Sequence, residues 1–282
     1  MNLENTIKFG SQLLKNSLIN SHELDAEILL SDIMGVSREF LLLNHNIEIS
    51  EEIKLKYNNS INRRLKKEPV AYITGKKEFW SRDFLVNKDT LIPRPETELL
   101  IYKVLNFFKN RNINILDIGT GSGCILLSLL KELDMARGIG IDICSKAIKI
   151  AKLNSKNLNL VQRSKFKVFD VKRFNEGRYD LIISNPPYIS SKDIKNLSKD
   201  IINNEPKKAL DGGLDGLDLI REVIYKSSKL LKKNGIFSLE IGYGQYQKVS
   251  SILKRHGYRE INKEYDCNQN VRCIMSTKAK FL

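Results

Sequence analysis

The residues best suited to chemistry in this sequence form the run Ser184-Asn185-Pro186-Pro187-Tyr188. This run follows the apolar stretch 179–183, and a buried strand must end there because neither proline can donate to a sheet. The Asn185 side-chain oxygen and the Pro186 carbonyl are two fixed acceptors, which suit a planar NH2 group with its two hydrogens. Tyr188 adds a flat face for an amide or a base. These residues indicate either a site for a planar nitrogen or an ordinary proline-rich turn after a strand.

A glycine-rich turn is the second candidate. The apolar stretch 115–118 runs into Gly119-Thr120-Gly121-Ser122-Gly123, and a helix-like segment follows at 125–133. Glycines permit a tight turn and a close approach to a ligand, and free N–H groups at a helix start favour a negative charge. The same pattern also serves as a plain strand-to-helix connection. A second apolar strand, 138–141, ends in Asp142, whose carboxylate can accept hydrogen bonds from both hydroxyls of a ribose.

The elements around these motifs alternate between strand and helix, which predicts an α/β domain with a mostly parallel sheet. In such sheets ligands bind at the carboxyl ends of the strands, where both motifs stand. The pattern predicts helices at 96–108, 125–133, 146–157, 216–232 and 244–255, and strands at 115–118, 138–141, 165–169, 179–184, 235–241, 259–265 and 271–276.

The first part of the chain has helical periodicity and no catalytic constellation of its own. Ser37 and Ser50 are candidate N-caps for two of its helices. Pro69 ends this region, and an alternating stretch suits a short hairpin. We therefore predict a helical domain over 1–68, a hairpin linker over 69–92 and the α/β domain over 93–282.

Composition limits the class of protein. The 282 residues are 41% hydrophobic and 28% charged, as expected for a globular protein, and no apolar run approaches the ~20 residues of a bilayer span. The chain starts without a secretory signal pattern, so we expect a cytoplasmic protein with no membrane contact. The formal charge of +14 fits either a nucleic-acid footprint or a lysine-favouring composition. The four cysteines lack metal-ligand spacing, and we expect no metal site.

Together the motifs resemble those of class I S-adenosylmethionine-dependent methyltransferases. The Asn-Pro-Pro-Tyr run is similar to that of enzymes that methylate a planar nitrogen, either a base amine or a glutamine amide. Two further segments, Leu-Ile-Pro-Arg-Pro-Glu-Thr-Glu at 91–98 and the glycine-rich stretch 204–217, are similar to those of the N5-glutamine methyltransferases of peptide chain release factors. Leu239-Glu240-Ile241-Gly242 and Gln245 continue the resemblance, which covers nearly the whole chain.

The resemblance implies a Rossmann-like, mostly parallel seven-stranded sheet, with an N-terminal helical domain that docks the substrate and is joined by a β-hairpin linker. It implies S-adenosylmethionine as cofactor, class 1 release factors as protein substrates, and the glutamine of their Gly-Gly-Gln motif as the methyl acceptor. Contact with nucleic acid is possible but not required. The implied catalytic residues are Asn185, Pro186 and Tyr188, and Pro187 joins them in binding the substrate. The implied cofactor residues are Asp117, Gly119, Thr120, Gly121, Ser122, Gly123, Asp142, Asp170, Val171 and Asn185. In the family the segment around Arg94 and Glu98 lies against the pocket, so these two side chains either position neighbouring loops or start a helix.

Three alternatives stay open. A nucleic-acid amino-methyltransferase, acting on adenine N6 or guanine N2, would use the same loop on a flipped base, but the segments 93–98 and 205–217 argue against it. A nucleotide-dependent dehydrogenase is disfavoured by the glycine spacing, which is one residue short of the dinucleotide pattern. A noncatalytic scaffold would be expected to have lost one of the two motifs. One departure from the family pattern stands at Asp266-Cys267, where the acid and the later Arg272 are kept but a leucine is not.

Overall fold

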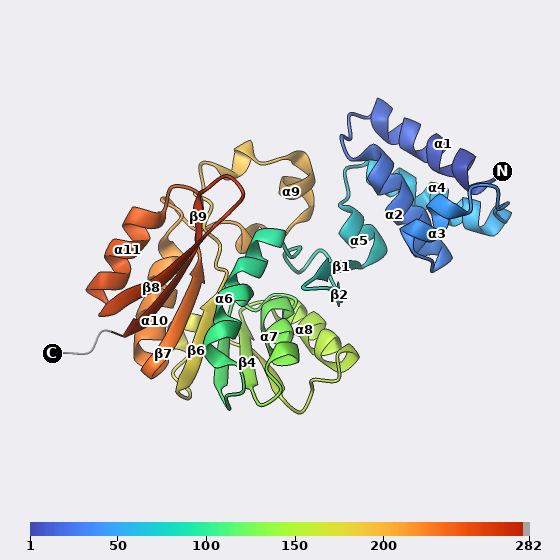
Figure 1. The fold of residues 1–282 in the computed structure, drawn as a ribbon. Helices are drawn as coiled ribbons and strands as arrows, with labels where there is room; N and C mark the ends of the chain where they lie inside the picture. Colours follow the sequence, from blue (N-terminus) through green and yellow to red (C-terminus); the bar gives the residue numbers. More distant parts are fainter. Residues whose placement is uncertain (279–282) are drawn as a thin grey trace. The chain divides into compact units, whose positions relative to one another are not determined.

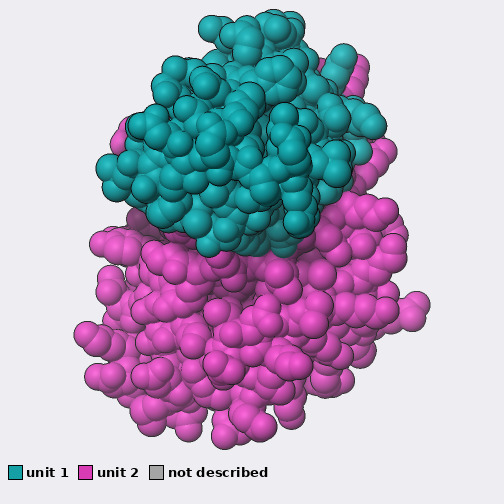
Figure 2. Space-filling view, turned by 90° about the vertical axis from the view of Figure 1, so that its right-hand side faces the viewer, with its two compact units in different colours: residues 1–76, 198–204 teal, residues 77–197, 205–282 magenta. Residues whose placement is uncertain are grey.

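The structure, a computed structural model, describes residues 1–278 as two compact units (Figure 1). Unit 1 consists of residues 1–76 and 198–204, and unit 2 of residues 77–197 and 205–278, as coloured in Figure 2. The chain therefore leaves unit 2 after residue 197, contributes a short segment to unit 1, and returns at residue 205. The domains predicted from the sequence, 1–68, 69–92 and 93–282, stay a prediction.

Unit 1 is helical. Its helices are α1 (Leu3–Asn16), α2 (His22–Met34), α3 (Arg38–Leu43), α4 (Glu51–Leu65), α5 (Val70–Thr74) and α9 (Lys199–Asn204). The side chains of Ser37 and Ser50 accept the backbone N–H groups of Phe40 and Ile53, so both predicted N-caps are confirmed. Leucine, isoleucine and tyrosine side chains on α1, α2 and α4 form one buried cluster. The apolar periodicity found in the sequence is the helical spacing of these buried side chains.

A buried arginine ties α9 into this unit. Arg64 on α4 donates from Nε to Asp25 Oδ2 at 2.7 Å and from Nη1 to Asp200 Oδ2 on α9 at 2.7 Å. Asn204 adds a hydrogen bond from its side-chain nitrogen to the carbonyl of Lys67 at 3.0 Å. Neither α9 nor the short helix α5 was expected from sequence, since both are too short to develop a periodic pattern.

A small hairpin, β1 (Lys76–Phe79) and β2 (Arg82–Leu85), follows the first helices. Its two turn residues, Trp80 and Ser81, have positive φ angles of 52° and 54°. That conformation matches a two-residue hairpin turn. The Glu98 carboxylate accepts the Trp80 backbone N–H at 2.8 Å and so holds the turn.

The sheet of unit 2 has seven strands in the order β5-β4-β3-β6-β7-β9-β8. Pairs from β5 through β7 are parallel, whereas β9 runs antiparallel to both β7 and β8. The strands are β3 (Asn114–Ile118), β4 (Arg137–Asp142), β5 (Ser164–Val168), β6 (Tyr179–Ser184), β7 (Leu231–Glu240), β8 (Tyr258–Tyr265) and β9 (Val271–Lys278). The predicted mostly parallel, seven-stranded Rossmann-like sheet is confirmed.

Helices cover both faces of this sheet (Figure 1). The cluster that contains Ile115 and Leu181 packs α6 (Leu99–Phe108), α7 (Cys124–Glu132) and α8 (Ser145–Asn157) on one face. The cluster that contains Leu116 and Ile182 packs α10 (Asp218–Leu230) and α11 (Tyr246–Arg255) on the other. Because neighbouring strand residues point to opposite faces, apolar residues in succession are what a sheet buried on both sides requires.

Short 3-10 turns complete the connections: η1 (Pro95–Glu98), η2 (Val171–Arg173), η3 (Ile194–Asn196) and η4 (Lys207–Ala209). The strand order reverses between β3 and β6, because β4 and β5 lie on one side of β3 while β6 and β7 lie on the other. In an open α/β sheet, the carboxyl ends of the strands at such a reversal form the expected ligand site. No helix within residues 1–278 is long and apolar enough to cross a lipid bilayer.

Candidate functional site

The two sequence motifs begin at adjacent strand ends. Ile118 at the end of β3 pairs in register with Ser184 at the end of β6. The Ser184 hydroxyl, fully buried, donates to the Ile118 carbonyl at 2.7 Å. The glycine turn and the Asn-Pro-Pro-Tyr loop therefore start side by side, at the point where the strand order reverses.

The glycine turn is built on a buried carboxyl. Asp117 is fully buried on β3, and its Oδ2 accepts the Thr120 hydroxyl at 2.6 Å, whereas Oδ1 has no hydrogen-bond partner within residues 1–278. Burial raises the pKa of Asp117 to about 7, against the Thr120 hydrogen bond, which lowers it. Gly119 and Gly121 have φ angles of +74° and +55° with open space where a side chain would stand. The turn thus leaves room for a ligand beside its backbone.

Asp142 closes the neighbouring strand, β4. Its Oδ2 accepts the Gly121 N–H at 3.0 Å and its Oδ1 accepts the Cys144 N–H at 2.8 Å. Burial raises the pKa of Asp142, while these backbone hydrogen bonds lower it. Each carboxylate oxygen has a second lone pair, so the group can still accept hydroxyl hydrogens.

The next strand end carries Asp170. The Phe169 N–H donates to the Asp142 carbonyl at 2.8 Å, which brings the end of β5 beside that of β4. Asp170 caps the turn η2 by accepting the Lys172 N–H, and Val171 is buried behind it.

The predicted cofactor residues Asp117, Gly119, Thr120, Gly121, Ser122, Gly123, Asp142, Asp170, Val171 and Asn185 therefore all lie along four adjacent strand ends. Three features of this edge fit S-adenosylmethionine: the unpaired Oδ1 of Asp117, the spare lone pairs of Asp142 and the open space at the glycines. The role of each residue in binding stays a prediction.

In the second motif the Asn185 amide is held by its nitrogen. Asn185 Nδ2 donates to the Thr97 hydroxyl oxygen at 3.0 Å, and Thr97 is 2% exposed. Pro186 is buried beside it, and Pro187 is half-buried. This leaves the acceptor end of the Asn185 amide, the end that the predicted chemistry uses, outside the hydrogen bond to Thr97.

Tyr188 is anchored through its hydroxyl. That hydroxyl donates to Glu240 Oε1 at 3.1 Å and accepts from Arg272 Nη2 at 3.1 Å, and the guanidinium carbon lies 5.5 Å from the ring centroid. One face of the ring is thus occupied by Arg272, the basic residue that the sequence retains after Asp266. The predicted packing of Tyr188 against a substrate amide stays a prediction.

Glu240, at the end of β7, is the second buried carboxyl of the site. It is 1% exposed, and its Oε2 has no well-aligned hydrogen-bond partner among the described residues. Burial raises the pKa of Glu240 to about 7, whereas the Thr97 hydroxyl, Arg272 and the Tyr188 hydroxyl lower it. Thr97 and Glu240 lie in the family-like segments 91–98 and 239–242, but neither was assigned a role in the site from the sequence. A glutamate at the buried end of a strand was the available signal.

The glycine-rich stretch 204–217 is hydrogen-bonded to the chain that directly follows the Asn-Pro-Pro-Tyr loop. The Ile189 N–H donates to the Leu210 carbonyl, and the Gly212 N–H donates to the Ile189 carbonyl at 2.8 Å. Gly216 approaches so closely that a side chain there would lie 2.4 Å from the Tyr188 carbonyl oxygen. Position 216 of the stretch 204–217 therefore requires glycine, because a side chain there would collide with the backbone of Tyr188.

Gln245 joins three loops at the same edge. Its Nε2 donates to the carbonyls of Tyr188 and Gly216 at 2.8 and 3.2 Å, and its Oε1 accepts the Gly242 N–H at 2.8 Å. A side-chain amide that uses both its ends in this way fixes the loops relative to one another.

The segment 91–98 is held by a buried glutamate. Glu205 pairs with the Arg94 guanidinium through Oε1 and accepts the Ile92 N–H through Oε2 at 3.3 Å. Two segments that looked like family hallmarks in the sequence are therefore bonded to each other. Arg94 holds the loop at Glu205 and Glu98 holds the hairpin turn, which agrees with the first of the two roles considered for them.

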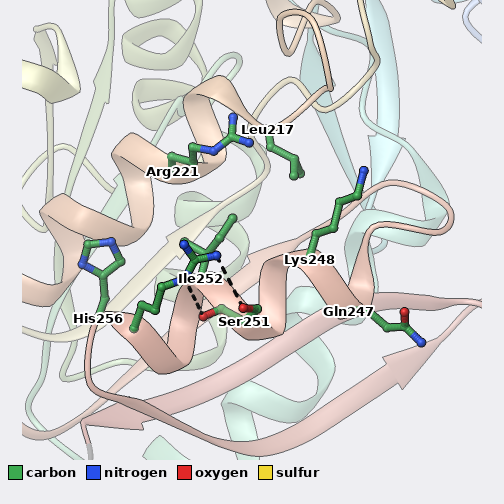
Figure 3. A pocket seen from close by; sticks show the side chains of 8 residues that line it. Leu217, Arg221, Gln247, Lys248, Ser251, Ile252 and His256 are labelled. Carbon is green, nitrogen blue, oxygen red and sulfur yellow. Dashed lines mark hydrogen bonds between the residues drawn. The ribbon is translucent and has the colours of Figure 1, made fainter.

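A cavity of about 550 Å³ opens beside Tyr188, and Lys192, Tyr243, Gln245 and Arg272 are among its lining residues. A separate cavity of about 530 Å³ lies between α10 and α11 (Figure 3). Several cationic side chains line this cavity. Of these, Arg221 already pairs with Asp215 and Asp218, and Arg255 donates a hydrogen bond to Ser251. This second cavity shares Lys248 with the first cavity, but none of its lining residues belongs to the two motifs, 119–123 and 184–188.

The chain matches two family models, "PrmC N-terminal domain" over residues 5–75 and "Methyltransferase small domain" over residues 96–214. It is 37% identical to the release factor glutamine methyltransferase of Caulobacter vibrioides over 94% of this chain and 92% of that protein. It is 39% identical to the protein of the same name from Clostridium acetobutylicum over 86% of each. Among solved structures, a methyltransferase from Pyrococcus furiosus superposes with a TM-score of 0.55 at 17% identity, covering 79% of this chain and 99% of that one. That last likeness concerns the fold alone.

Proposed function

Because the chain belongs to the family of release factor glutamine methyltransferases, we propose that it methylates the side-chain amide nitrogen, N5, of the glutamine in the Gly-Gly-Gln motif of class 1 peptide chain release factors. The chain is an S-adenosylmethionine-dependent methyltransferase, as its relatives and its methyltransferase domain indicate. The comparisons support this function and not the nucleic-acid alternative. A cytoplasmic location, where release factors act, goes with the proposal.

One observation carries the proposal: the Asn185 amide is held by its nitrogen, through Thr97, beside the buried Pro186. The side-chain oxygen of Asn185 and the carbonyl of Pro186 are then the two acceptors of the loop. A glutamine amide nitrogen carries two hydrogens and can satisfy both acceptors at once. A substrate hydroxyl or carboxylate could not, because a hydroxyl oxygen carries only one hydrogen and a carboxylate carries none.

The chemical difficulty is that an amide nitrogen is a poor nucleophile, because its lone pair is delocalised. When bound, S-adenosylmethionine supplies a methyl group activated by a sulfonium. The residues that would hold it are Asp117 with the glycine turn, Asp142, and Asp170 with Val171, along the strand ends. Asn185 and Pro186 orient the substrate nitrogen by accepting both its hydrogens, which aligns the reactants. The same acceptors stabilise the positive charge that develops on this nitrogen.

The reaction releases a proton from the substrate nitrogen. Among the described residues we assign no side chain as a dedicated base for the substrate nitrogen. None is needed if the proton leaves this nitrogen after methyl transfer. The loops held by Gln245 and Gly216 keep the acceptors rigid during the reaction.

The test is transfer of labelled methyl from S-adenosylmethionine to a purified class 1 release factor. The matched substrate is the same factor with Gln→Ala in its Gly-Gly-Gln loop, and duplex DNA and ribosomal RNA run alongside. Label only on the unmutated factor is the expected result. Label on nucleic acid, or equal label on the Gln→Ala factor, would overturn the proposal. The whole folded factor is required because a short free peptide lacks the partner that presents the loop.

In the enzyme, Asn185→Ala is expected to reduce kcat by about 100-fold, since it removes one of two acceptors aligned on the reacting nitrogen. Cofactor binding, measured by calorimetry, should be kept, because the other predicted cofactor residues remain in place. Asn157→Ala, at an exposed position in the same unit, is the control and should retain full turnover. Turnover close to wild type in the Asn185→Ala protein would refute the assigned role.

A further inference from the structure

A buried asparagine outside both motifs lies behind the glycine turn. Asn154 stands in the last turn of α8 and is 1% exposed. Asparagine is mostly exposed in proteins, because a buried amide costs free energy unless its polar atoms are hydrogen-bonded. The Asn154 side chain meets that condition with three hydrogen bonds, all to backbone groups of two other segments.

Two of these bonds join Asn154 to the second strand of the hairpin. Asn154 Oδ1 accepts the Leu85 N–H at 2.8 Å, and Asn154 Nδ2 donates to the Leu85 carbonyl at 3.0 Å. Paired residues of antiparallel strands exchange hydrogen bonds in the same way. The side-chain amide therefore takes the place of a neighbouring strand residue at the end of β2.

The third bond reaches the glycine turn. The second hydrogen of Asn154 Nδ2 goes to the Ser122 carbonyl at 2.9 Å, and this contact is buried. The N–H of the same peptide unit, that of Gly123, donates to the Thr120 carbonyl at 2.8 Å. The peptide between Ser122 and Gly123 is therefore held at both of its polar ends, by the turn itself at one and by Asn154 at the other.

These contacts also determine the orientation of the amide. With the Asn154 amide turned over, its oxygen would face two carbonyl oxygens and its NH2 group would face the Leu85 N–H, so all three contacts would be repulsive. Ala151 lies on the same face of α8, three residues earlier, and a side chain at Gly123 would come within 3.2 Å of its Cβ. Helix α8 thus packs directly against the turn.

A turn with three glycines is costly to order. The glycines at 119, 121 and 123 have positive φ angles, and glycine loses more conformational freedom on folding than any other residue. The carboxyl groups of Asp117 and Asp142 hold the start and the middle of the turn, and Asn154 holds its end. A turn that is ordered before its ligand arrives binds more tightly than one that must be ordered on binding.

We propose that Asn154 is a positioning residue for the cofactor: it fixes the end of the glycine turn against β2 and so keeps the turn in the shape that receives S-adenosylmethionine. It acts through the Ser122 carbonyl and belongs to neither motif. The inference rests on the proposed cofactor role of the glycine turn and not on the identity of the methyl acceptor. Loss of Asn154 should weaken cofactor binding and spare the methyl-transfer step, because Asn185 and Pro186 stay in place.

Asn154→Ala, which removes all three hydrogen bonds, tests the proposal. Ser155→Ala is the matched control, because Ser155 is the next residue of α8, is 3% exposed, and is hydrogen-bonded to the Ser164 hydroxyl at 2.7 Å. Calorimetry should show S-adenosylmethionine binding about tenfold weaker in Asn154→Ala, the effect of one hydrogen bond, and unchanged in Ser155→Ala. Turnover at saturating cofactor should stay close to wild type in both. Wild-type affinity in Asn154→Ala, or an equal loss in Ser155→Ala, would refute the inference.

Asn154→Asp is a second variant, for use also if Asn154→Ala does not fold. Aspartate keeps the size of asparagine and can accept the Leu85 N–H, but its carboxylate has no hydrogen to give to the Ser122 carbonyl. We expect S-adenosylmethionine to bind at least about tenfold more weakly at pH 8. Wild-type affinity in this variant would show that the bond to Ser122 plays no part in cofactor binding.

Hydrogen exchange of the Leu85 amide in the cofactor-free protein gives a readout without activity. This N–H should exchange faster in Asn154→Ala than in the wild-type and Ser155→Ala proteins, because its acceptor is lost. Equal rates in all three proteins would contradict the inference whatever the substrate. If the exchange and binding results are as expected but the wild-type enzyme fails to methylate the release factor, the proposed substrate is wrong and the role of Asn154 stands.

Discussion

Asp117 and Glu240 are buried carboxyl groups near the carboxyl ends of β3 and β7, and burial raises the pKa of each to about 7. The charge of Asp142 contributes to the raised pKa of Asp117, and the charge of Asp117 contributes to the raised pKa of Cys124. Those around Glu240 are Arg272, Tyr188, Cys273 and Glu96. Between about pH 4 and pH 7 the folded state therefore holds protons at these two sites that the unfolded chain has released.

This difference sets the sign of a stability change. A carboxyl whose pKa is higher in the folded state destabilises that state progressively as pH rises through the window, because it must then carry a buried charge. We expect Asp117→Asn to gain stability relative to wild type, by about 2 kcal/mol, as the pH is raised from 5 to 8. The measurement is the free energy of unfolding of the cofactor-free protein in urea at several pH values.

The control for this prediction is Asp134→Asn at an exposed position of the same unit. Its unfolding free energy should run parallel to that of wild type. Parallel curves for Asp117→Asn as well would mean that Asp117 does not titrate in this range.

At the scale of loops, the strand ends depend on close backbone contacts rather than on large side chains. Gly216 and Gly244 offer a matched comparison, because their φ angles are +74° and +72°. A side chain at Gly216 would lie 2.4 Å from the Tyr188 carbonyl oxygen and 2.8 Å from Gln245 Nε2, whereas at Gly244 nothing lies within 4 Å. The two positions share backbone strain and differ only in the contact.

We therefore expect Gly244→Ala to cost about 1 kcal/mol of stability with little change in kcat, the cost of a positive φ angle alone. Gly216→Ala should cost more stability and should reduce kcat by about tenfold or more, since it displaces the carbonyl of Tyr188 and breaks the Gln245 clamp. Thermal unfolding and steady-state turnover of the two variants measure the difference. Equal kcat values would indicate that the loop adapts without consequence for the reaction.

At the scale of the whole molecule, unit 1 includes a short piece of chain that lies, in sequence, between two loops of unit 2. Residues 198–204 stand between the Asn-Pro-Pro-Tyr loop and Glu205, and Asp200 within them pairs with the buried Arg64 of α4. This ion pair lies within unit 1 and joins α9 to α4 there. A substrate-docking role for that unit stays a prediction.

Arg64→Met is expected to destabilise unit 1 by about 3 kcal/mol, because Asp25 would remain as a buried carboxylate without its partner. Asp200→Asn should cost far less, since that side chain is 33% exposed and the Arg64 to Asp25 pair survives. Trypsin should nevertheless cut at Lys199 faster in Asp200→Asn than in wild type, because α9 is released. Unchanged cleavage in that variant would show that the ion pair does not hold α9.

The sequence by itself determined the longer elements and the two motifs. Helices and strands of the α/β unit repeat their apolar residues with fixed periods, and the prolines and glycines of 119–123 and 185–188 allow few backbone conformations. Such features are local and can be found along the chain. The ordered motifs also identified the family, which the relatives bear out.

Only the tertiary structure decided which side chains complete the site and which segments hold it. The bond between Asn185 and Thr97 joins residues 88 positions apart, and that between Tyr188 and Glu240 joins residues 52 apart. The place of 198–204 in unit 1 likewise goes with bonds to Arg64 and Lys67, both distant in sequence. Hydrogen bonds of this kind follow from where the sheet brings strand ends together and leave no period in the sequence. A buried hydroxyl such as Thr97 contacts Asn185 only because folding brings the segment 91–98 beside the Asn-Pro-Pro-Tyr loop.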